Sequence, residues 1–327
     1  MKIAVTGASG FLGSHVAQQL VDAGHAVRAV VRKTSDTRYL RGLDKVELFE
    51  GSVEDRASCF AACKGVDAVI HAAGLVKART TAEFRLTNVV GTQNMIDAAK
   101  AEAASIKRFV MVSSLTARAP SPDGNPLPVD AEPRPVTAYG RSKLEGERIA
   151  LEARDAMHVT VVRPTGVYGP RDKEMYQLFQ FAKMRVLPYI GDPDGKLTLI
   201  HGEDCARALV LCLTADIPSG RAYDVDDGRI YTRAQLAEGL EGAVGRKAWM
   251  SFPIPKPIAF GYATASELYG RVANKAVMVK REKMDELLQQ WVGYSKPAHD
   301  ELGFAARHTW MEGARQTAKW YRDNGWL

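Results

Sequence analysis

The feature that most constrains this chain is the alternation of short β-branched runs with segments of helical length through its first half. The β-branched runs predict strands, and the segments between them carry helical spacing. A strand, helix, strand order repeated five times needs right-handed crossovers, and therefore a parallel sheet covered on both faces. The sequence predicts an α/β fold with a doubly wound parallel sheet. The predicted strands are 2–6, 26–31, 46–49, 67–71, 107–112 and 159–163, and the predicted helices are 11–23, 54–63, 81–104 and 136–154.

The second half of the chain predicts a smaller lobe. After Pro170 the strand rhythm loosens, although 221–225 has the pattern of one more buried strand. We therefore expect a first domain over 1–170, to which 200–228 returns, and an interleaved C-terminal lobe over 171–327. Apolar and aromatic residues at helical spacing over 252–273 are expected in the core, and 310–322 predicts a final amphipathic helix.

A proline-rich segment separates the fifth and sixth predicted strands. Residues 118–135 hold six of the fifteen prolines. A long loop in a compact domain is usually functional or a linker. Because a helix bearing a Tyr and a Lys follows it, we expect this loop to form a wall of the active site.

Composition excludes several classes of protein. An apolar fraction of 46% and a charged fraction of 25% are ordinary for a folded domain. No apolar run approaches the ~18 residues of a membrane helix, and no signal-peptide core follows Met1, so a cytoplasmic protein without a membrane partner is expected. The net charge of +6 is dispersed, which does not favour nucleic acid as a partner. The four cysteines lack paired CxxC spacing, so we expect buried free thiols and no metal site.

A glycine pattern directly after the first predicted strand indicates a dinucleotide site. Glycines permit a tight turn and close approach of a pyrophosphate, while the following helix offers unpaired N–H groups. The predicted contacts in this turn are Gly7, Ser9, Gly10, Phe11, Leu12 and Gly13.

The end of the second predicted strand favours NADP over NAD. A carboxylate there would accept from the ribose 2′-hydroxyl of NAD, whereas an arginine meets the 2′-phosphate of NADP. Val31 is followed by Arg32, Lys33 and Ser35, without an acid. We therefore expect NADP as cofactor, with NAD as the alternative.

Tyr139 and Lys143 lie four residues apart, on one face of a predicted helix. An ammonium beside a phenol stabilises the phenolate, and lowering a tyrosine pKa from ~10 towards 7 requires about 4 kcal/mol. The sequence predicts that Lys143 lowers the pKa of Tyr139, so that this side chain exchanges a proton near neutral pH.

Several ordered motifs together resemble the extended short-chain dehydrogenase/reductases, the NAD(P)-dependent epimerase/dehydratase family. The resemblance is strongest to dihydroflavonol-reductase-like and hydroxysteroid-dehydrogenase-like members, and it covers nearly the whole chain. The motifs are the glycine pattern, His71-Ala72-Ala73-Gly74, the segment from Asn88 to Asn94, Ser113-Ser114, Tyr139 with Lys143, the segment from Arg163 to Pro170, His201-Gly202-Glu203-Asp204 and the closing Trp320-Tyr321.

The resemblance implies a Rossmann domain and a set of site residues. Ser114 would hold a substrate oxygen beside Tyr139, with Ser113 or Thr116 as alternatives, Lys143 would hold the nicotinamide ribose, and Asn88 would order the proton relay. His201 and Asp204 are expected to be structural or to line the substrate site, and Arg163 to be structural. The further cofactor contacts implied are Ser52, Val53, His71, Ala72, Ala73, Gly74, Pro164 and Val167.

The chain departs from the family at Ser52, where relatives commonly have an aspartate that binds adenine. The backbone of Val53, or Asp55, is the expected substitute. A homodimer through helices 81–104 and 136–154 is also expected. There Met95, Ile96, Ala99 and Leu144 have two open roles, in the interface or against the sheet.

Three functions remain open. The first is an NADP-dependent oxidoreductase acting on a carbonyl or secondary alcohol of a small, hydrophobic substrate. The aromatic-rich stretch 252–269 favours such a substrate, with a role in the core as its alternative. The second is an NAD-dependent nucleotide-sugar epimerase, and the third is a non-catalytic dinucleotide-sensing protein. A nucleotide sugar would need cations for its diphosphate, and the candidates are Arg171, Lys173, Arg207, Arg229 and Arg271.

Overall fold

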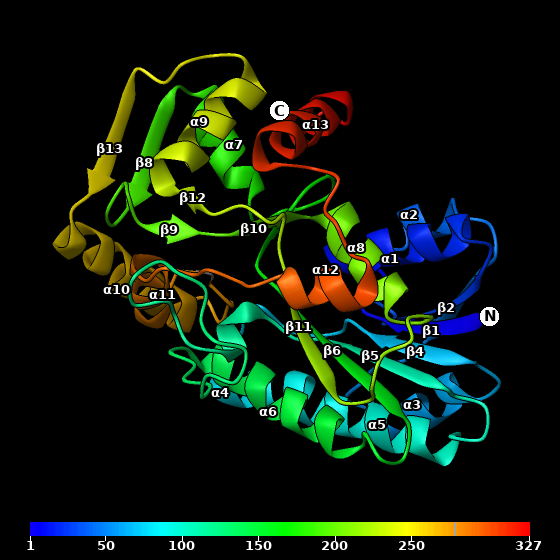
Figure 1. Ribbon diagram of the computed structural model, residues 1–327. Helices are drawn as coiled ribbons and strands as arrows, with labels where there is room; N and C mark the ends of the chain where they lie inside the picture. The colour runs from blue at the N-terminus through cyan, green and yellow to red at the C-terminus, as the bar shows by residue number, and fades with distance from the viewer. Residues whose placement is uncertain (278) are drawn as a thin grey trace.

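Seven strands form one sheet at the centre of the computed structural model, which describes residues 1–277 and 279–327 (Figure 1). Their order is β3, β2, β1, β4, β5, β6, β11, and each neighbouring pair is parallel. The predicted doubly wound sheet is confirmed. Its strand order reverses between β1 and β4, which is where such sheets bind ligands. The strands are β1 (Lys2–Thr6), β2 (Ala26–Val31), β3 (Val46–Glu50), β4 (Ala68–His71), β5 (Arg108–Val112), β6 (His158–Pro164) and β11 (Arg221–Val225).

Helices cover both faces of the sheet because successive strand residues point to opposite sides. Ile3 and Val5 pack with α1 (Phe11–Asp22) and α8 (Gly202–Leu211), whereas Ala4 faces the opposite layer. Figure 1 shows this second layer below the sheet. It consists of α3 (Arg56–Cys63), α5 (Gly91–Ala101) and α6 (Ala138–Glu152).

The helix predicted over 81–104 is regular only in part. It begins as α4 (Thr81–Phe84), continues as a π-helical turn over Arg85–Val90 and ends as α5 at Ala101. The π-turn carries Asn88, whose amide is hydrogen-bonded away from the helix, and π-turns of this kind often mark functional sites. The other predicted strands and helices of the first half agree with the structure to within about two residues.

The C-terminal lobe has its own core, formed around the buried side chains of Tyr168, Phe179, Trp310 and Tyr321. The lobe consists of α7 (Tyr176–Lys183), β8 (Val186–Ile190), α9 (Arg233–Val244), β13 (Met250–Ile254), α10 (Lys256–Val272), α11 (Arg281–Leu288) and α13 (Trp310–Asp323). The second half of the chain also contributes to the first core, since α8 packs on the central sheet and β11 is one of its strands.

Short elements connect the two parts. The strand pair β7 (Gly166–Tyr168) and β10 (Leu199–His201) is parallel, and the pair β9 (Lys196–Leu197) and β12 (Tyr231–Thr232) is antiparallel. Helix α12 (Lys296–Leu302) packs against β11, α2 (Arg38–Arg41) follows β2, and a 3-10 turn over Leu115–Ala117 follows β5.

The prediction that 252–273 lies in the core is wrong for most of its large apolar residues, although Ile254 and Phe260 pack against a small cluster. The segment forms β13 and α10, but Ile258 and Tyr262 are exposed, and so are Leu268 and Tyr269. Helix α10 packs mainly through the small residues Ala259 and Ala263. The predicted helix is therefore present, but most of its large apolar side chains face solvent. Two other predictions are confirmed: the four cysteines are buried and free, and α13 spans the predicted amphipathic helix. No helix of the described residues is long and apolar enough to cross a membrane.

Candidate active site

The turn after β1 is so tight that two of its positions require glycine. Gly7 has a φ of 68°, and a Cβ there would lie 2.8 Å from the backbone nitrogen of Ala73. At Gly13 a Cβ would lie 2.1 Å from the carbonyl oxygen of Gly7. Helix α1 therefore begins against the end of β1, with Gly10 as its N-cap and no side chain capping its first N–H groups. An uncapped helix N-terminus of this kind suits a pyrophosphate.

A cavity of about 1440 Å³ opens at the carboxyl ends of the strands. Pockets for one small ligand usually measure ~300–1,000 Å³, so this cavity has room for a dinucleotide and a second molecule. Its lining runs from the glycine turn and the ends of β2, β4 and β5 to α7, β8 and α11 of the C-terminal lobe.

The structure brings most of the predicted cofactor residues together around this cavity, but Lys33 and His71 do not line it. Both ring nitrogens of His71 are hydrogen-bonded inside the protein, Nδ1 to the Thr6 hydroxyl at 2.8 Å and Nε2 to that of Thr92 at 3.1 Å. Burial lowers its pKa to about 3, so the ring is neutral and joins β1, β4 and α5. The residues that line the cavity are Gly7, Ser9, Gly10, Phe11, Leu12, Gly13, Arg32, Ser35, Ser52, Val53, Ala72, Ala73, Gly74, Tyr139, Lys143, Pro164 and Val167.

The end of β2 presents a cation and an acid to the cavity. Arg32 is exposed, and its backbone N–H donates to the Ser35 hydroxyl at 3.0 Å. Asp36 also lines the cavity, but Arg38 donates to its carboxylate through Nη2 at 2.6 Å and Nε at 3.0 Å. The acid at this position is thus already paired, whereas no ion pair of Arg32 is formed among the described residues.

The segment after β3 lines the cavity, and its first residues, Gly51 to Val53, carry no carboxylate. Ser52 and Val53 both face the cavity, and the backbone N–H of Ser52 donates to the Ser58 hydroxyl at 2.9 Å. Asp55 does not line the cavity, because it caps α3 by accepting from the backbone N–H of Ala57 at 3.1 Å. Of the two expected substitutes for the missing aspartate, only Val53 is in position.

Two local features bring Tyr139 to Ser114. The Thr137 hydroxyl caps α6 by accepting from the backbone N–H of Gly140 at 3.1 Å. A Cβ at Gly140 would lie 2.3 Å from the carbonyl oxygen of Thr116, so the start of α6 packs directly on the 3-10 turn after β5. Ser114 caps that turn, and its hydroxyl lies 2.8 Å from that of Thr116. Ser113, the other candidate, donates instead to Glu147 at 2.9 Å.

Lys143 lies one helical turn after Tyr139 and is buried. Its Nζ donates to the carbonyl oxygen of Val112 at 2.6 Å, at the end of β5. Burial lowers the pKa of Lys143 to about 8, opposed by the negative charge of Glu147. The ammonium is therefore held beside the cavity while losing its proton more easily than an exposed lysine.

The prediction that Lys143 lowers the pKa of Tyr139 is wrong in this structure. Burial raises the pKa of Tyr139 to about 12, because it disfavours the phenolate more than the hydrogen bond with Ser114 favours it. Lys143 instead contacts the backbone of β5. At neutral pH the Tyr139 hydroxyl is therefore protonated.

Asn88 does not line the cavity, but it holds two parts of the site in place. Its Oδ1 accepts from the backbone N–H of Leu75 at 2.8 Å, and its Nδ2 donates to the Ser142 hydroxyl at 2.9 Å. A Cβ at Gly74 would lie 3.2 Å from Asn88 Oδ1 and 3.5 Å from Lys143 Nζ, so the loop after β4 lies close to both side chains. Asn88 thus joins the loop after β4 to α6 next to Lys143.

The sequence analysis missed a buried charge network beneath Lys143. Glu147 accepts from Arg163 Nε at 3.0 Å, and Arg163 Nη1 lies 3.8 Å from Asp224, which pairs with Arg118 at 2.7 Å. Arg163 is thus structural, as expected. Glu147 follows Lys143 by four residues, the same spacing that singled out Tyr139, and this signal could have identified it.

We call the part of the cavity lined by the glycine turn and the end of β2 the cofactor end, and the part lined by residues 178–326 the far end. The far end is lined mainly by apolar and aromatic side chains. Trp320 and Trp326 come from the C-terminal segment, and neither was predicted to line the site, although Trp320 belongs to the closing motif. The stretch 252–269 contributes no lining residue. The aromatic and aliphatic side chains here are Leu178, Phe181, Leu187, Tyr189, Ile190, Leu236, Leu240, Val279, Leu287, Trp291, Trp320 and Trp326.

The cations at this far end are already engaged. Arg233 donates to the backbone carbonyls of Asp192, Leu287 and Gln289, and Lys283 pairs with Glu286. Arg171 and Lys173 line the cofactor end instead, where Arg171 lies 4.0 Å over the ring of Tyr39.

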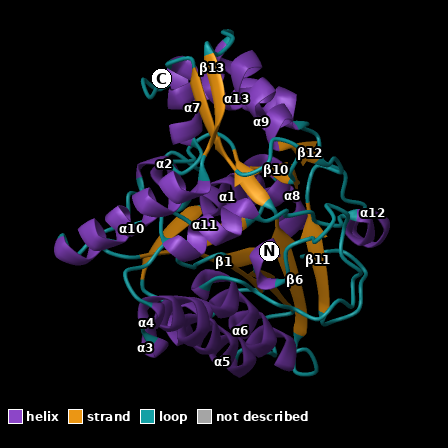
Figure 2. Ribbon diagram, turned by 90° about the vertical axis from the view of Figure 1, so that its left-hand side faces the viewer, coloured by secondary structure: helices purple, strands orange, loops and turns teal. Residues whose placement is uncertain are grey.

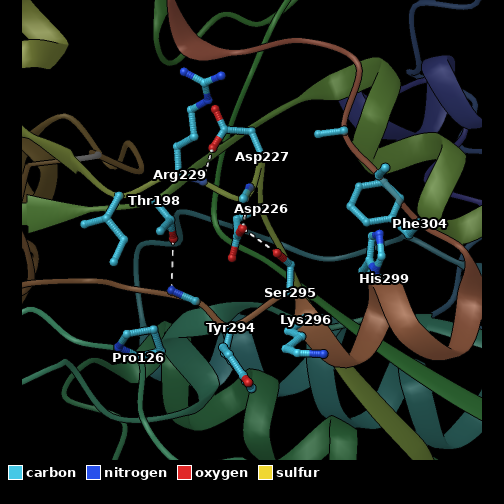
Figure 3. Close-up of a pocket in the computed structure, with 15 residues that line it drawn as sticks. Pro126, Thr198, Asp226, Asp227, Arg229, Tyr294, Ser295, Lys296, His299 and Phe304 are labelled. Atoms are coloured by element: carbon cyan, nitrogen blue, oxygen red, sulfur yellow. Dashed lines mark hydrogen bonds between the residues drawn. The ribbon is translucent and has the colours of Figure 1, made fainter.

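Three other predicted positions lie elsewhere. His201 and Asp204 do not line the cavity, and Asp204 accepts from His308 Nδ1 at 2.9 Å, joining α8 to the C-terminal segment. Residues 118–135 do not form the expected wall, because the backbone N–H of Ser121 pairs this loop with Gln290 at 2.8 Å. Its Pro126 lines a smaller pocket of about 430 Å³ with Asp226 and Arg229 (Figure 3), which contains none of the predicted catalytic or cofactor residues.

Comparison with known proteins gives a family match over most of the chain. The model of the NAD dependent epimerase/dehydratase family matches residues 3–226. The chain is 32% identical to a ceramide reductase of Caulobacter vibrioides over 329 residues, covering 99% of this chain and 96% of the relative. It is 26% identical to a UDP-glucose 4-epimerase of Vibrio cholerae, covering 97% and 94%.

Solved structures share the fold over the whole chain. The crystal structure of gox2253 superposes with a TM-score of 0.82 at 26% identity, covering 99% of both chains. MoeE5, solved with UDP-glucuronic acid and NAD, gives a TM-score of 0.77 at 23% identity, covering 99% of this chain and 100% of its own. These comparisons agree with the resemblance drawn from the motifs.

Proposed function

The chain belongs to the NAD-dependent epimerase/dehydratase family and is an NAD(P)-dependent oxidoreductase, and on that premise we propose that it uses NADPH to reduce the carbonyl of a small, apolar substrate. One observation carries the proposal. Ser114, Tyr139 and Lys143 line a cavity whose cofactor end has an exposed arginine and whose substrate end is apolar, with its cations engaged.

The glycine turn fits a dinucleotide, because Gly7 and Gly13 leave no room for a Cβ and the first N–H groups of α1 have no side-chain cap. NADPH bound there would supply the hydride. Tyr139 donates its proton to the carbonyl oxygen of the substrate, and the Ser114 hydroxyl donates a second hydrogen bond to the same atom. Lys143, fixed by the carbonyl of Val112, holds a positive charge beside the reacting groups.

The reducing direction is supported by the protonation of Tyr139. With its pKa raised to about 12, the phenol carries the proton that reduction consumes. Oxidation of an alcohol would need the phenolate, which burial disfavours. The protonated phenol thus suits the reducing direction that we propose.

Preference for NADP is supported by the end of β2. Arg32 faces the cavity without an acidic partner among the described residues, while Asp36 is paired with Arg38. A guanidinium can bind a 2′-phosphate through two hydrogen bonds. NAD remains the alternative cofactor.

An apolar substrate is supported by the far end of the cavity and by the similarity to a ceramide reductase. The second candidate function is an NAD-dependent nucleotide-sugar epimerase, favoured by the similarity to a UDP-glucose 4-epimerase. A UDP-sugar would need cations for its diphosphate, but Arg233 and Lys283 are engaged by other groups. The presence of Ser114, Tyr139 and Lys143 together disfavours a non-catalytic sensor.

Tyr139→Phe tests the proposed chemistry. The ring volume is kept and the proton donor is lost, so NADPH-dependent turnover of a ketone should fall by a factor on the order of 10²–10⁴ with cofactor affinity nearly unchanged. Tyr294→Phe is the matched control, since Tyr294 lies in the smaller pocket. Turnover by Tyr139→Phe within about threefold of the unmodified protein would exclude this mechanism.

We also propose a cytoplasmic homodimer. The cytoplasm is supported by four free, buried cysteines without a disulfide. In the expected interface, Met95, Ile96, Ala99 and Leu144 are buried. The first three belong to the core beneath the sheet. Leu86 and Val90 are the exposed apolar residues of that helical layer which support a contact there.

A further inference from the structure

Helix α10 presents a continuous apolar face to solvent. Ile258, Tyr262, Leu268, Tyr269 and Val272 are between 58% and 81% exposed. At 100° per residue these five positions fall within one sector of about 120° on the helix. We call these five residues the α10 stripe.

The inner face of α10 is made of small residues. Ala259, Ala263 and Gly270 are buried, and the two alanines pack with Met284 of α11. At Gly270 a Cβ would lie 3.0 Å from the carbonyl oxygen of Lys275, so this side has no space for a larger residue. Most bulky side chains of α10 therefore point outward, whereas Phe260 is partly buried and packs against the same cluster. Contiguous exposed apolar residues of this kind mark an interaction site.

Basic residues outnumber acidic ones in the chain segment that contains the stripe. Between residues 245 and 276 the chain has five Lys and Arg and one acid, Glu267. The carboxylate of Glu267 accepts from the backbone N–H of Arg281 at 2.6 Å. The five basic side chains are all exposed, and they are Arg246, Lys247, Lys256, Arg271 and Lys275. An apolar helix face flanked by lysine and arginine is typical of helices that lie in the headgroup region of an anionic bilayer.

The stripe lies beside the substrate end of the cavity. Helix α11, on which α10 packs, contributes Lys283, Glu286 and Leu287 to the cavity lining. Strand β13, which leads into α10, pairs with β8, and β8 lines the cavity through Leu187 and Ile190. Figure 2 shows α10 projecting from the body of the molecule. A single convex helix matches a deformable lipid surface better than a partner that needs a groove.

We propose that the α10 stripe inserts into the surface of an anionic lipid bilayer and places the cavity mouth next to apolar substrates held there. The sequence analysis expected no membrane partner. A surface contact needs no spanning helix, and the exposed stripe changes that expectation. Binding to the bilayer stands by itself, whereas delivery of substrate rests on the proposed reductase function.

Flotation with vesicles tests the binding. The full chain should float with vesicles of equimolar phosphatidylcholine and phosphatidylglycerol. The variant Ile258→Gln, Tyr262→Gln, Tyr269→Gln should lose binding by a factor on the order of tenfold or more. Glutamine keeps helix propensity, so α10 should still form. The control variant Val129→Gln, Val136→Gln changes exposed apolar residues elsewhere and should bind as the unmodified protein does.

Charge variants test the lipid partner. Lys256→Gln with Arg271→Gln should weaken binding to the phosphatidylglycerol vesicles, while Lys100→Gln, on α5, should not. Failure of the unmodified protein to float, or equal flotation of the triple variant, would overturn the proposal. It would also be overturned if sedimentation showed an oligomer that the triple variant dissociates, since the stripe would then bind a second copy of this chain.

Reduction assays separate this proposal from the proposed function. All stripe variants should reduce a water-soluble ketone at the unmodified rate, and the triple variant should be slower only with a ketone held in vesicles. Vesicle binding without any ketone reduction would reject the reductase function and leave the bilayer contact intact. Equal rates with the vesicle-held ketone would reject the delivery of substrate.

Discussion

At the scale of a single residue, the proposed preference for NADP rests on Arg32. Arg32→Ala removes the guanidinium that faces the cavity and leaves the Asp36–Arg38 pair in place. We expect NADPH to bind the unmodified protein more tightly than NADH, and this preference to fall by roughly tenfold to a hundredfold in the variant. Titration calorimetry measures both constants. Lys33→Ala, next to Arg32 but outside the cavity lining, should leave them unchanged. Equal or tighter NADH binding by the unmodified protein would contradict the assignment.

The pH profile of reduction follows from Lys143 and Tyr139. The pKa of Lys143 is lowered to about 8, so its ammonium is present below that pH and is lost as the pH rises through it. The pKa of Tyr139 is raised to about 12, so its proton is retained throughout this range. We expect kcat/KM for ketone reduction to be level below about pH 8 and to fall above it. A kcat/KM that stays level up to pH 9, or rises with pH, would contradict the role assigned to the Lys143 ammonium.

At the scale of elements, α6 is anchored to β6 by the buried pair of Glu147 and Arg163. In Glu147→Gln the only carboxylate left near the Arg163 guanidinium, among the described residues, is that of Asp224, at 3.8 Å. Breaking a buried ion pair costs about 3–5 kcal/mol of folding free energy. Urea denaturation should show this loss. Glu145→Gln on the same helix breaks the exposed pair with Arg85 and should cost less than about 1 kcal/mol. Similar losses for the two variants would refute the anchoring role.

Glu147→Gln should also act on Lys143. The negative charge of Glu147 opposes the lowering of the Lys143 pKa, so its removal should move the fall in kcat/KM to a lower pH. A purely structural role of Glu147 would leave the pH profile in place.

Elements of the sheet were predictable because each depends on local pattern. The β-branched runs define the strands, and Gly7 and Gly13 identify the turn where backbone meets backbone. Helix α10 was predicted as an apolar helical segment but assigned to the core, because periodicity identifies an apolar face without saying whether that face points inward. Only its contact with α11 reveals that Ala259 and Ala263 are the packed side.

At the scale of the whole molecule, the substrate end of the cavity was beyond sequence reasoning. Trp320 and Trp326 lie about 180 residues after Tyr139 in the chain and reach the same cavity only through the fold. The hydrogen-bond partners of Arg233 could not be predicted from the sequence either, since they are three backbone carbonyls that no side-chain pattern encodes. The cofactor end was predictable because its contacts follow single strand ends, whereas the substrate end is assembled from four helices and a strand.

The central claim is that this cavity reduces an apolar ketone with NADPH rather than epimerising a nucleotide sugar. The most direct measurement presents aromatic and alicyclic ketones with NADPH, in parallel with UDP-glucose and UDP-galactose, and follows both NADPH absorbance and sugar composition. The account predicts NADPH oxidation with at least one ketone, and no interconversion of the sugars. Interconversion of the two sugars without net cofactor consumption, together with no ketone reduction, would contradict it.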